Sequence, residues 1–136
     1  MLEVELRKVM AHMERDLVDA ERQLMQLRRR ALRLGFYDIA TSCLHGRHMV
    51  AGLSCDRVKA LYVARLIAKE QPKAVNIKLL ALLLEKAGKY RAASNAYKNL
   101  LDVLVVGSDD HGRYYDVATE GLRRTQQRLR RAGSDR

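Results

Sequence analysis

Residues 74 to 107 decide the fold, and they read AVNIKLLALLLEKAGKYRAASNAYKNLLDVLVVG. The stretch holds two runs with apolar residues at helical spacing, and Gly88 separates them. The first run is almost continuously apolar from Ile77 to Leu84, which is typical of a helix with neighbours on several sides. A glycine between two helical patterns is typical of the turn in an antiparallel helix pair. We therefore predict a helical hairpin here.

The N-terminal part predicts one long amphipathic helix over residues 1–34. Its apolar side chains recur at steps of three or four residues before a stop at Gly35. They are Leu2, Leu6, Val9, Met13, Leu17, Ala20, Leu24, Leu27 and Ala31.

The rest of the chain shows the same helical spacing of apolar residues. A helix is expected over residues 36–51 with Phe36 facing inward, and Ser54 is a good N-cap for the next one. Pro72 closes that segment, and a last helix is expected over residues 110–131, followed by a frayed tail over residues 132–136. The whole is an all-α domain, residues 1–131, of about six antiparallel helices, with residues 36–107 forming two helix pairs.

Composition supports a helical protein and limits its function. The 136 residues are 48% hydrophobic and 5% aromatic, with one proline and eight glycines, which excludes disorder as the main state and disfavours a β-sandwich. A net charge of +10 favours an acidic partner. Two cysteines, and an N-terminus without a leader pattern, indicate a cytoplasmic protein. The longest apolar run, residues 79–84, is too short to span a bilayer, so we expect no insertion of a membrane-spanning segment.

The two helix pairs recur at an interval of about 35 residues. Leu80-Ala81, Gly88, Tyr90, Ala93 and Tyr97 follow one another at the spacing of a tetratricopeptide repeat. Residues 74–107 thus resemble this family, and residues 39–72 resemble it less closely. The resemblance implies stacked helical hairpins, with the first and last helices capping the ends.

A second resemblance covers residues 81–131. Ala87-Gly88-Lys89-Tyr90 and the arginine-rich last helix are similar to a MIT domain, a three-helix module of membrane-trafficking proteins. Both families bind short segments of other proteins.

The tetratricopeptide resemblance implies a ligand groove lined by the first helix of each pair. The matching positions are Arg47, Lys78, Leu82, Glu85 and Lys86. Lys78 stands where some members bind a C-terminal carboxylate, but Leu82 replaces the asparagine that completes that clamp. We therefore expect a non-enzymatic adaptor, chaperone or regulatory subunit that binds an acidic or amphipathic segment of another protein. That partner could be a second copy of the chain.

Metal binding and catalysis are disfavoured. The possible ligands Cys43, His45, His48 and Cys55 lie close in sequence, yet Cys43 and His45 point about 200° apart on a helix. Helices also supply no strand end or glycine-rich loop for an oxyanion site. We expect no metal, no other cofactor and no enzymatic activity.

Nucleic acid is the alternative partner. Two arginine-rich segments could bind phosphates or acidic surfaces. Their candidate residues are Arg28, Arg29, Arg30, Arg123, Arg124, Arg128 and Arg131. The alternative interpretation is a solvated cationic face on each helix. No aromatic residues for base stacking are interleaved with these arginines, so we do not expect sequence-specific recognition.

Overall fold

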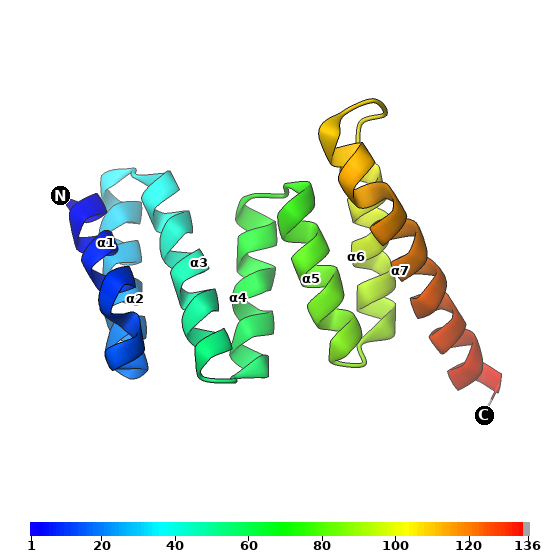
Figure 1. The fold of residues 1–136 in the computed structure, drawn as a ribbon, viewed down its shortest axis with the longest axis horizontal. Helices are drawn as coiled ribbons and strands as arrows, with labels where there is room; N and C mark the ends of the chain where they lie inside the picture. The colour runs from blue at the N-terminus through cyan, green and yellow to red at the C-terminus, as the bar shows by residue number, and fades with distance from the viewer. Residues whose placement is uncertain (135–136) are drawn as a thin grey trace. The chain divides into compact units, whose positions relative to one another are not determined.

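The computed structural model describes residues 1–134, which form seven α-helices, one 3₁₀ turn and no strand (Figure 1). The elements are α1 (Leu2–His12), η1 (Met13–Arg15), α2 (Leu17–Leu34), α3 (Tyr37–Leu53), α4 (Arg57–Glu70), α5 (Ala74–Lys86), α6 (Tyr90–Val103) and α7 (Asp109–Ser134). The all-α prediction is confirmed. The chain divides into two compact units, Met1–Glu70 and the part from Gln71 onward, where the sequence led us to expect one domain.

The expected long helix over residues 1–34 is wrong, because the chain turns back between α1 and α2. Asp16 has extended backbone angles (φ −153°, ψ 96°), and its carboxylate accepts a hydrogen bond of 3.0 Å from the backbone N–H of Asp19. This N-cap begins α2 as a separate helix. The two halves of the apolar stripe therefore face each other and α3, instead of lying along one continuous rod.

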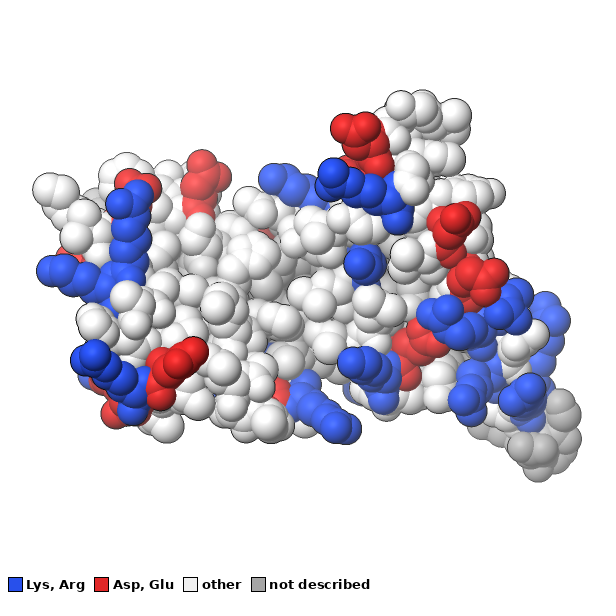
Figure 2. All heavy atoms as spheres, in the orientation of Figure 1, with Lys and Arg blue, Asp and Glu red and all other residues white. Residues whose placement is uncertain are grey.

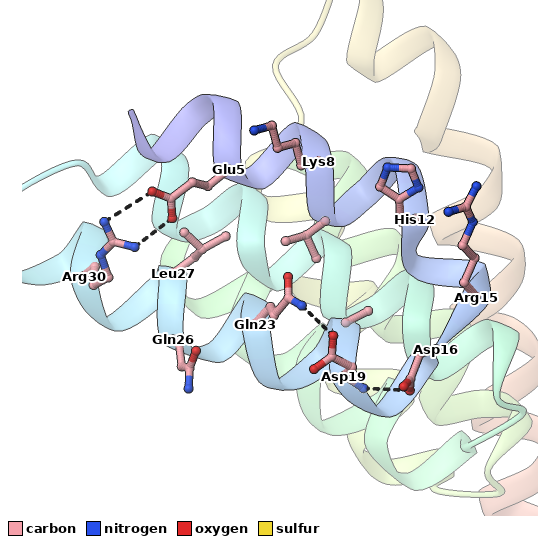
Figure 3. A pocket seen from close by; sticks show the side chains of 12 residues that line it. Glu5, Lys8, His12, Arg15, Asp16, Asp19, Gln23, Gln26, Leu27 and Arg30 are labelled. Carbon is pink, nitrogen blue, oxygen red and sulfur yellow. Dashed lines mark hydrogen bonds and ion pairs between the residues drawn. The ribbon is translucent and has the colours of Figure 1, made fainter.

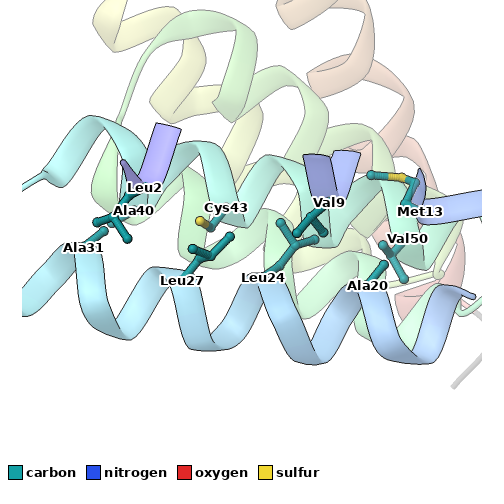
Figure 4. Close-up of a cluster of buried hydrophobic side chains, with 10 residues drawn as sticks. All are labelled: Leu2, Val9, Met13, Ala20, Leu24, Leu27, Ala31, Ala40, Cys43 and Val50. Atoms are coloured by element: carbon teal, nitrogen blue, oxygen red, sulfur yellow. The ribbon is translucent and has the colours of Figure 1, made fainter. Parts of the chain in front are cut away.

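Three helices of the first unit share one core (Figure 4). Leu24 and Leu27 of α2 pack with Cys43 of α3 and with Val9 of α1. Gly46 lets these helices approach closely, since a Cβ at that position would lie 2.8 Å from the Met10 Sδ atom. The remaining helix, α4, packs on α3 through a smaller cluster of Leu44, Val63 and Ile67.

The second unit is a helical hairpin covered by α7. Gly88 has a φ of +75° and makes the turn between α5 and α6, as the sequence predicts. Tyr97 of α6 is fully buried, and its ring lies where any side chain at Gly121 of α7 would have to go. The structure extends α7 to Ser134, so residues 132–134 are helical where a frayed tail was expected, and residues 135–136 lie outside the described residues.

Two local expectations also need correction. Ser54 does not begin α4: its hydroxyl donates to the Val50 carbonyl at the end of α3, at 2.8 Å. Asp56 is the cap, because its carboxylate accepts the Lys59 N–H at 3.0 Å. Phe36 precedes α3 and remains 51% exposed instead of facing inward.

Candidate functional site

The predicted groove residues are divided between the two units. Arg47 lies on α3 in the first unit, and Lys78, Leu82, Glu85 and Lys86 lie on α5 in the second. We therefore describe them separately. The structure brings together, within one unit, only the four residues of α5.

The Arg47 side chain belongs to an ion-pair network between helices of the first unit. Its guanidinium Nη2 lies 3.6 Å from the Glu21 carboxylate of α2, and the Lys59 ammonium of α4 lies 2.6 Å from the same carboxylate. The Arg47 side chain is only 12% exposed. This network connects α2, α3 and α4, so Arg47 already has a structural partner.

Three of the α5 residues form a row at intervals of one turn. Lys78, Leu82 and Lys86 follow one another at i, i+4 and i+8, so they lie on one side of the helix. Lys86 is exposed, and Leu82 and Lys78 are half-buried. The Lys78 ammonium lies 5.5 Å from the centre of the Tyr114 ring of α7. Below we call Lys78, Leu82 and Lys86 the α5 row.

A hollow of about 450 Å³ adjoins the N-terminal end of this row. It is lined in part by Val75 of α5 and by Arg113 and Tyr114 of α7. Val75 is 52% exposed. Lys73 and Asp110 also line it, so the hollow adds apolar, cationic and acidic side chains beside the α5 row.

The fourth α5 residue, Glu85, is bound inside the unit. Its carboxylate accepts hydrogen bonds from Arg124 Nε at 2.9 Å, from Arg124 Nη2 at 3.0 Å and from the Tyr97 hydroxyl at 2.7 Å. These bonds, with that from Arg124 the largest cause, hold the pKa of Glu85 below its usual range. Burial, together with the neighbouring Glu85 carboxylate, raises the pKa of Tyr97 to about 12. Because Arg124 neutralises Glu85, the two lysines of the α5 row determine the charge there.

Some arginines of both arginine-rich segments already contact other side chains of their own unit. In α2, Arg28 pairs with Glu70 of α4, and Arg30 lies 2.7 Å from Glu5 of α1, whereas Arg29 is exposed.

In α7, Arg124 binds Glu85, as described above. Arg123 pairs with Glu120 at 2.9 Å, and the Arg128 guanidinium lies 5.7 Å from the centre of the Tyr90 ring. Arg131 is exposed. Figure 2 shows Lys and Arg side chains gathered over the C-terminal half of α7.

A second groove, of about 440 Å³, runs between α1 and α2 (Figure 3). Lys8 and His12 line its α1 side, and Asp16 and Asp19 line its α2 side. The ion pair between Glu5 and Arg30 closes one end. Sequence reasoning missed this groove because it requires two helices where one was predicted. The Asp16-x-x-Asp19 cap was the signal that could have revealed it.

The possible metal ligands are dispersed. Cys43 is buried in the core, where burial raises the pKa of its thiol, and Cys55 is exposed in the turn before α4. His45 is exposed, and burial lowers the pKa of the half-buried His48. Within residues 1–134, no group of three or more His, Cys, Asp or Glu side chains is placed to hold a metal ion.

Comparisons with protein families, with curated proteins and with solved structures found no match to this chain. None of the helices in the described part of the chain is both long enough and apolar enough to cross a bilayer.

Proposed function

We propose that the chain is a non-enzymatic protein-binding module that holds an acidic, partly apolar segment of another protein on the α5 row. The observation that carries this proposal is the order of side chains along that row: two lysines lie one turn on either side of a leucine. Such an order fits a segment with carboxylates on both sides of an apolar residue.

The electrostatics of the second unit support a ligand of this kind. The only carboxylate beside the row on α5 is Glu85, and Arg124 neutralises it. The adjoining hollow is lined by the cations Lys73 and Arg113 and by the carboxylate of Asp110, so its charged side chains leave one net positive charge. A carboxylate-bearing segment is therefore favoured over a basic one.

The free energies of ion pairs and of apolar burial indicate that the ligand needs both kinds of contact. An exposed ion pair contributes about 0–1 kcal/mol, so two lysines alone would bind weakly. Burial of the exposed parts of Val75 and Leu82 adds about 25 cal/mol for each Å² of apolar surface. The ligand should therefore contain apolar residues, and its binding should depend only moderately on salt.

The family resemblances point to the same class of function. Residues 74–107 resemble a tetratricopeptide repeat, whose ligands bind to the first helix of each pair, and α5 is the first helix of the hairpin in this stretch. In this interpretation α7 is the capping helix. The resemblance of residues 81–131 to a MIT domain also implies the binding of short protein segments.

Charge reversal along the α5 row tests the proposal. The full chain, K78E/K86E and the control K69E/K98E are immobilised, and the proteins each retains from native lysate are quantified by mass spectrometry. Lys69 and Lys98 are exposed lysines on α4 and α6, so the control carries the same change of net charge. We expect a set of proteins that K78E/K86E loses about tenfold and the control keeps.

The same experiment must check that all three proteins are folded and must identify the retained protein. Circular dichroism should show equal helix content in all three proteins. Identical retention by K78E/K86E and by the control would reject the α5 row as the binding site. If the retained protein is the chain itself, the module is a homodimer.

A second candidate function rests on the arginines that gather over the C-terminal half of α7. Arg123, Arg128 and Arg131 could bind phosphates of nucleic acid without base recognition. Binding to random-sequence DNA and RNA at two salt concentrations tests this. Submicromolar affinity with a steep salt dependence would favour it over the protein-binding module.

A further inference from the structure

The turn between α2 and α3 exposes three large apolar side chains within four residues. Leu34 is 61% exposed, Phe36 51% and Tyr37 68%. Burial of such side chains is one of the main gains of folding, so their exposure leaves apolar surface available for contact with an apolar partner. We call Leu34, Phe36 and Tyr37 the apolar tip.

The backbone holds the apolar tip in a defined conformation. Gly35 ends α2 with a φ of +80°, and the Phe36 N–H donates to the Ala31 carbonyl at 2.8 Å. α3 begins at Tyr37, directly after this turn. In this kind of helix end the residue after the glycine commonly packs back on the helix, but Phe36 stays half-exposed.

Two exposed arginines of α2 precede the apolar tip, and one carboxylate follows it. Arg29 and Arg33 are exposed and lie one turn apart on the same side of α2. Glu70 neutralises Arg28, and Glu5 neutralises Arg30. The acidic residue closest to the apolar tip in sequence is Asp38, in the first turn of α3.

We propose that the apolar tip docks on an anionic lipid bilayer, with Leu34, Phe36 and Tyr37 in the interface and Arg29 and Arg33 at the lipid phosphates. With a rise of about 1.5 Å per residue, Arg33 and Arg29 lie about 3 Å and 9 Å before Gly35 along α2. The polar layer on each side of a bilayer is about 5–8 Å thick. With α2 along the bilayer normal, the spacing places Arg33 inside that layer and Arg29 at its outer edge when the apolar tip enters the interface.

Charge distinguishes this partner from a second copy of the chain. Two apolar tips in symmetric contact would bring two sets of Arg29 and Arg33 together, and like charges would oppose the contact. An anionic bilayer supplies both an apolar phase and negative charge. Three apolar side chains and two cations make a reversible attachment, not a permanent anchor.

The absence of tryptophan from the sequence allows a direct test. F36W places a single tryptophan in the apolar tip of the full chain. The control V18W places one at an 82% exposed position near the opposite end of the same helix. Each protein is mixed with vesicles of phosphatidylcholine alone, or with about a third phosphatidylglycerol, and brominated lipid serves as a quencher.

With anionic vesicles, we expect blue-shifted and quenched emission for F36W and unchanged emission for V18W. In the F36W background, R29E/R33E should weaken vesicle binding about 20-fold or more. R57E/R65E, which reverses two exposed arginines of α4, should change it little.

Three results would overturn the proposal. They are no response of F36W to anionic vesicles, equal binding to neutral and anionic vesicles, and a blue shift that grows with protein concentration in the absence of lipid. The last would mean that a second copy covers the apolar tip. Because the vesicles contain no other protein, the outcome is separate from that of the test of the α5 row.

Discussion

The ring of Tyr97 fills the space beside Gly121, where a Cβ would lie 2.2 Å from the Tyr97 Cζ atom. Real Cβ atoms do not approach another carbon so closely. Tyr97 is fully buried, and its hydroxyl donates to Glu85. Helices α6 and α7 can therefore approach closely only because residue 121 is a glycine.

The first prediction concerns this contact. Gly121→Ala should destabilise the second unit by about 1–3 kcal/mol, because the ring must shift in a packed core. Gly112→Ala on the same helix is the control: a Cβ there meets nothing within 4 Å, so alanine should stabilise by about 0.5–1 kcal/mol. Urea denaturation of both variants measures the effects, and equal stabilities would contradict the packing described.

The second prediction concerns the start of α2. Asp16→Ala removes the acceptor for the Asp19 N–H and should cost about 0.5–2 kcal/mol of stability. Glu14→Ala changes an exposed acid in the preceding turn, and it should have little effect. Thermal unfolding followed by circular dichroism compares them. A larger loss for Glu14→Ala would show that Asp16 does not begin the helix.

The third prediction compares neighbouring arginines. Arg124→Ala leaves the half-buried Glu85 carboxylate without its guanidinium partner and should cost about 1–3 kcal/mol. Arg123→Ala breaks an exposed pair with Glu120 and should cost about 0–0.5 kcal/mol. Both variants change the net charge equally. Equal losses in denaturant titrations would mean that the bond between Arg124 and Glu85 adds no more to stability than the exposed pair of Arg123 and Glu120.

The fourth prediction is a dependence of stability on pH at both extremes. The folded state lowers the pKa of Glu85, so its stabilisation is present above the unfolded pKa and is lost as pH falls through the folded value. The folded state raises the pKa of Tyr97 to about 12. Its stabilisation is therefore present below the unfolded pKa of about 10 and is lost as pH rises towards the folded value.

Two variants separate these limbs of the pH profile. Glu85→Gln should flatten the acid limb, and Tyr97→Phe should flatten the alkaline limb. Urea midpoints across pH, with tyrosinate absorbance for the alkaline side, provide the measurement. An alkaline limb unchanged in Tyr97→Phe would assign the loss to other groups.

Much of the local structure could be predicted from residues near one another in sequence. The apolar spacing and Gly88 predict the hairpin of α5 and α6, because helical period and a left-handed glycine are local properties. The break at Asp16 was missed because the apolar stripe keeps the same spacing across it. Only the contacts of α1 and α2 with each other and with α3 show that the chain folds back there.

The candidate site was less predictable. Tyr62 and Tyr97 are separated by the interval of about 35 residues at which the helix pairs recur, yet Tyr62 is 55% exposed and Tyr97 is fully buried beneath α7. The sequence also places Glu85 beside Lys78 and Lys86 as if all were free to bind. Its partner Arg124 lies 39 residues away, so no local pattern could reveal the pair.

By itself the sequence determined that the chain is helical, that α5 and α6 form a hairpin about Gly88, and that the chain is cationic, because these follow from period, turn residues and composition. The tertiary structure alone decided which charged side chains are neutralised by a partner and which apolar side chains stay in contact with water. Those two properties depend on residues brought together from distant parts of the chain, and they select the α5 row and the apolar tip as the surfaces to test.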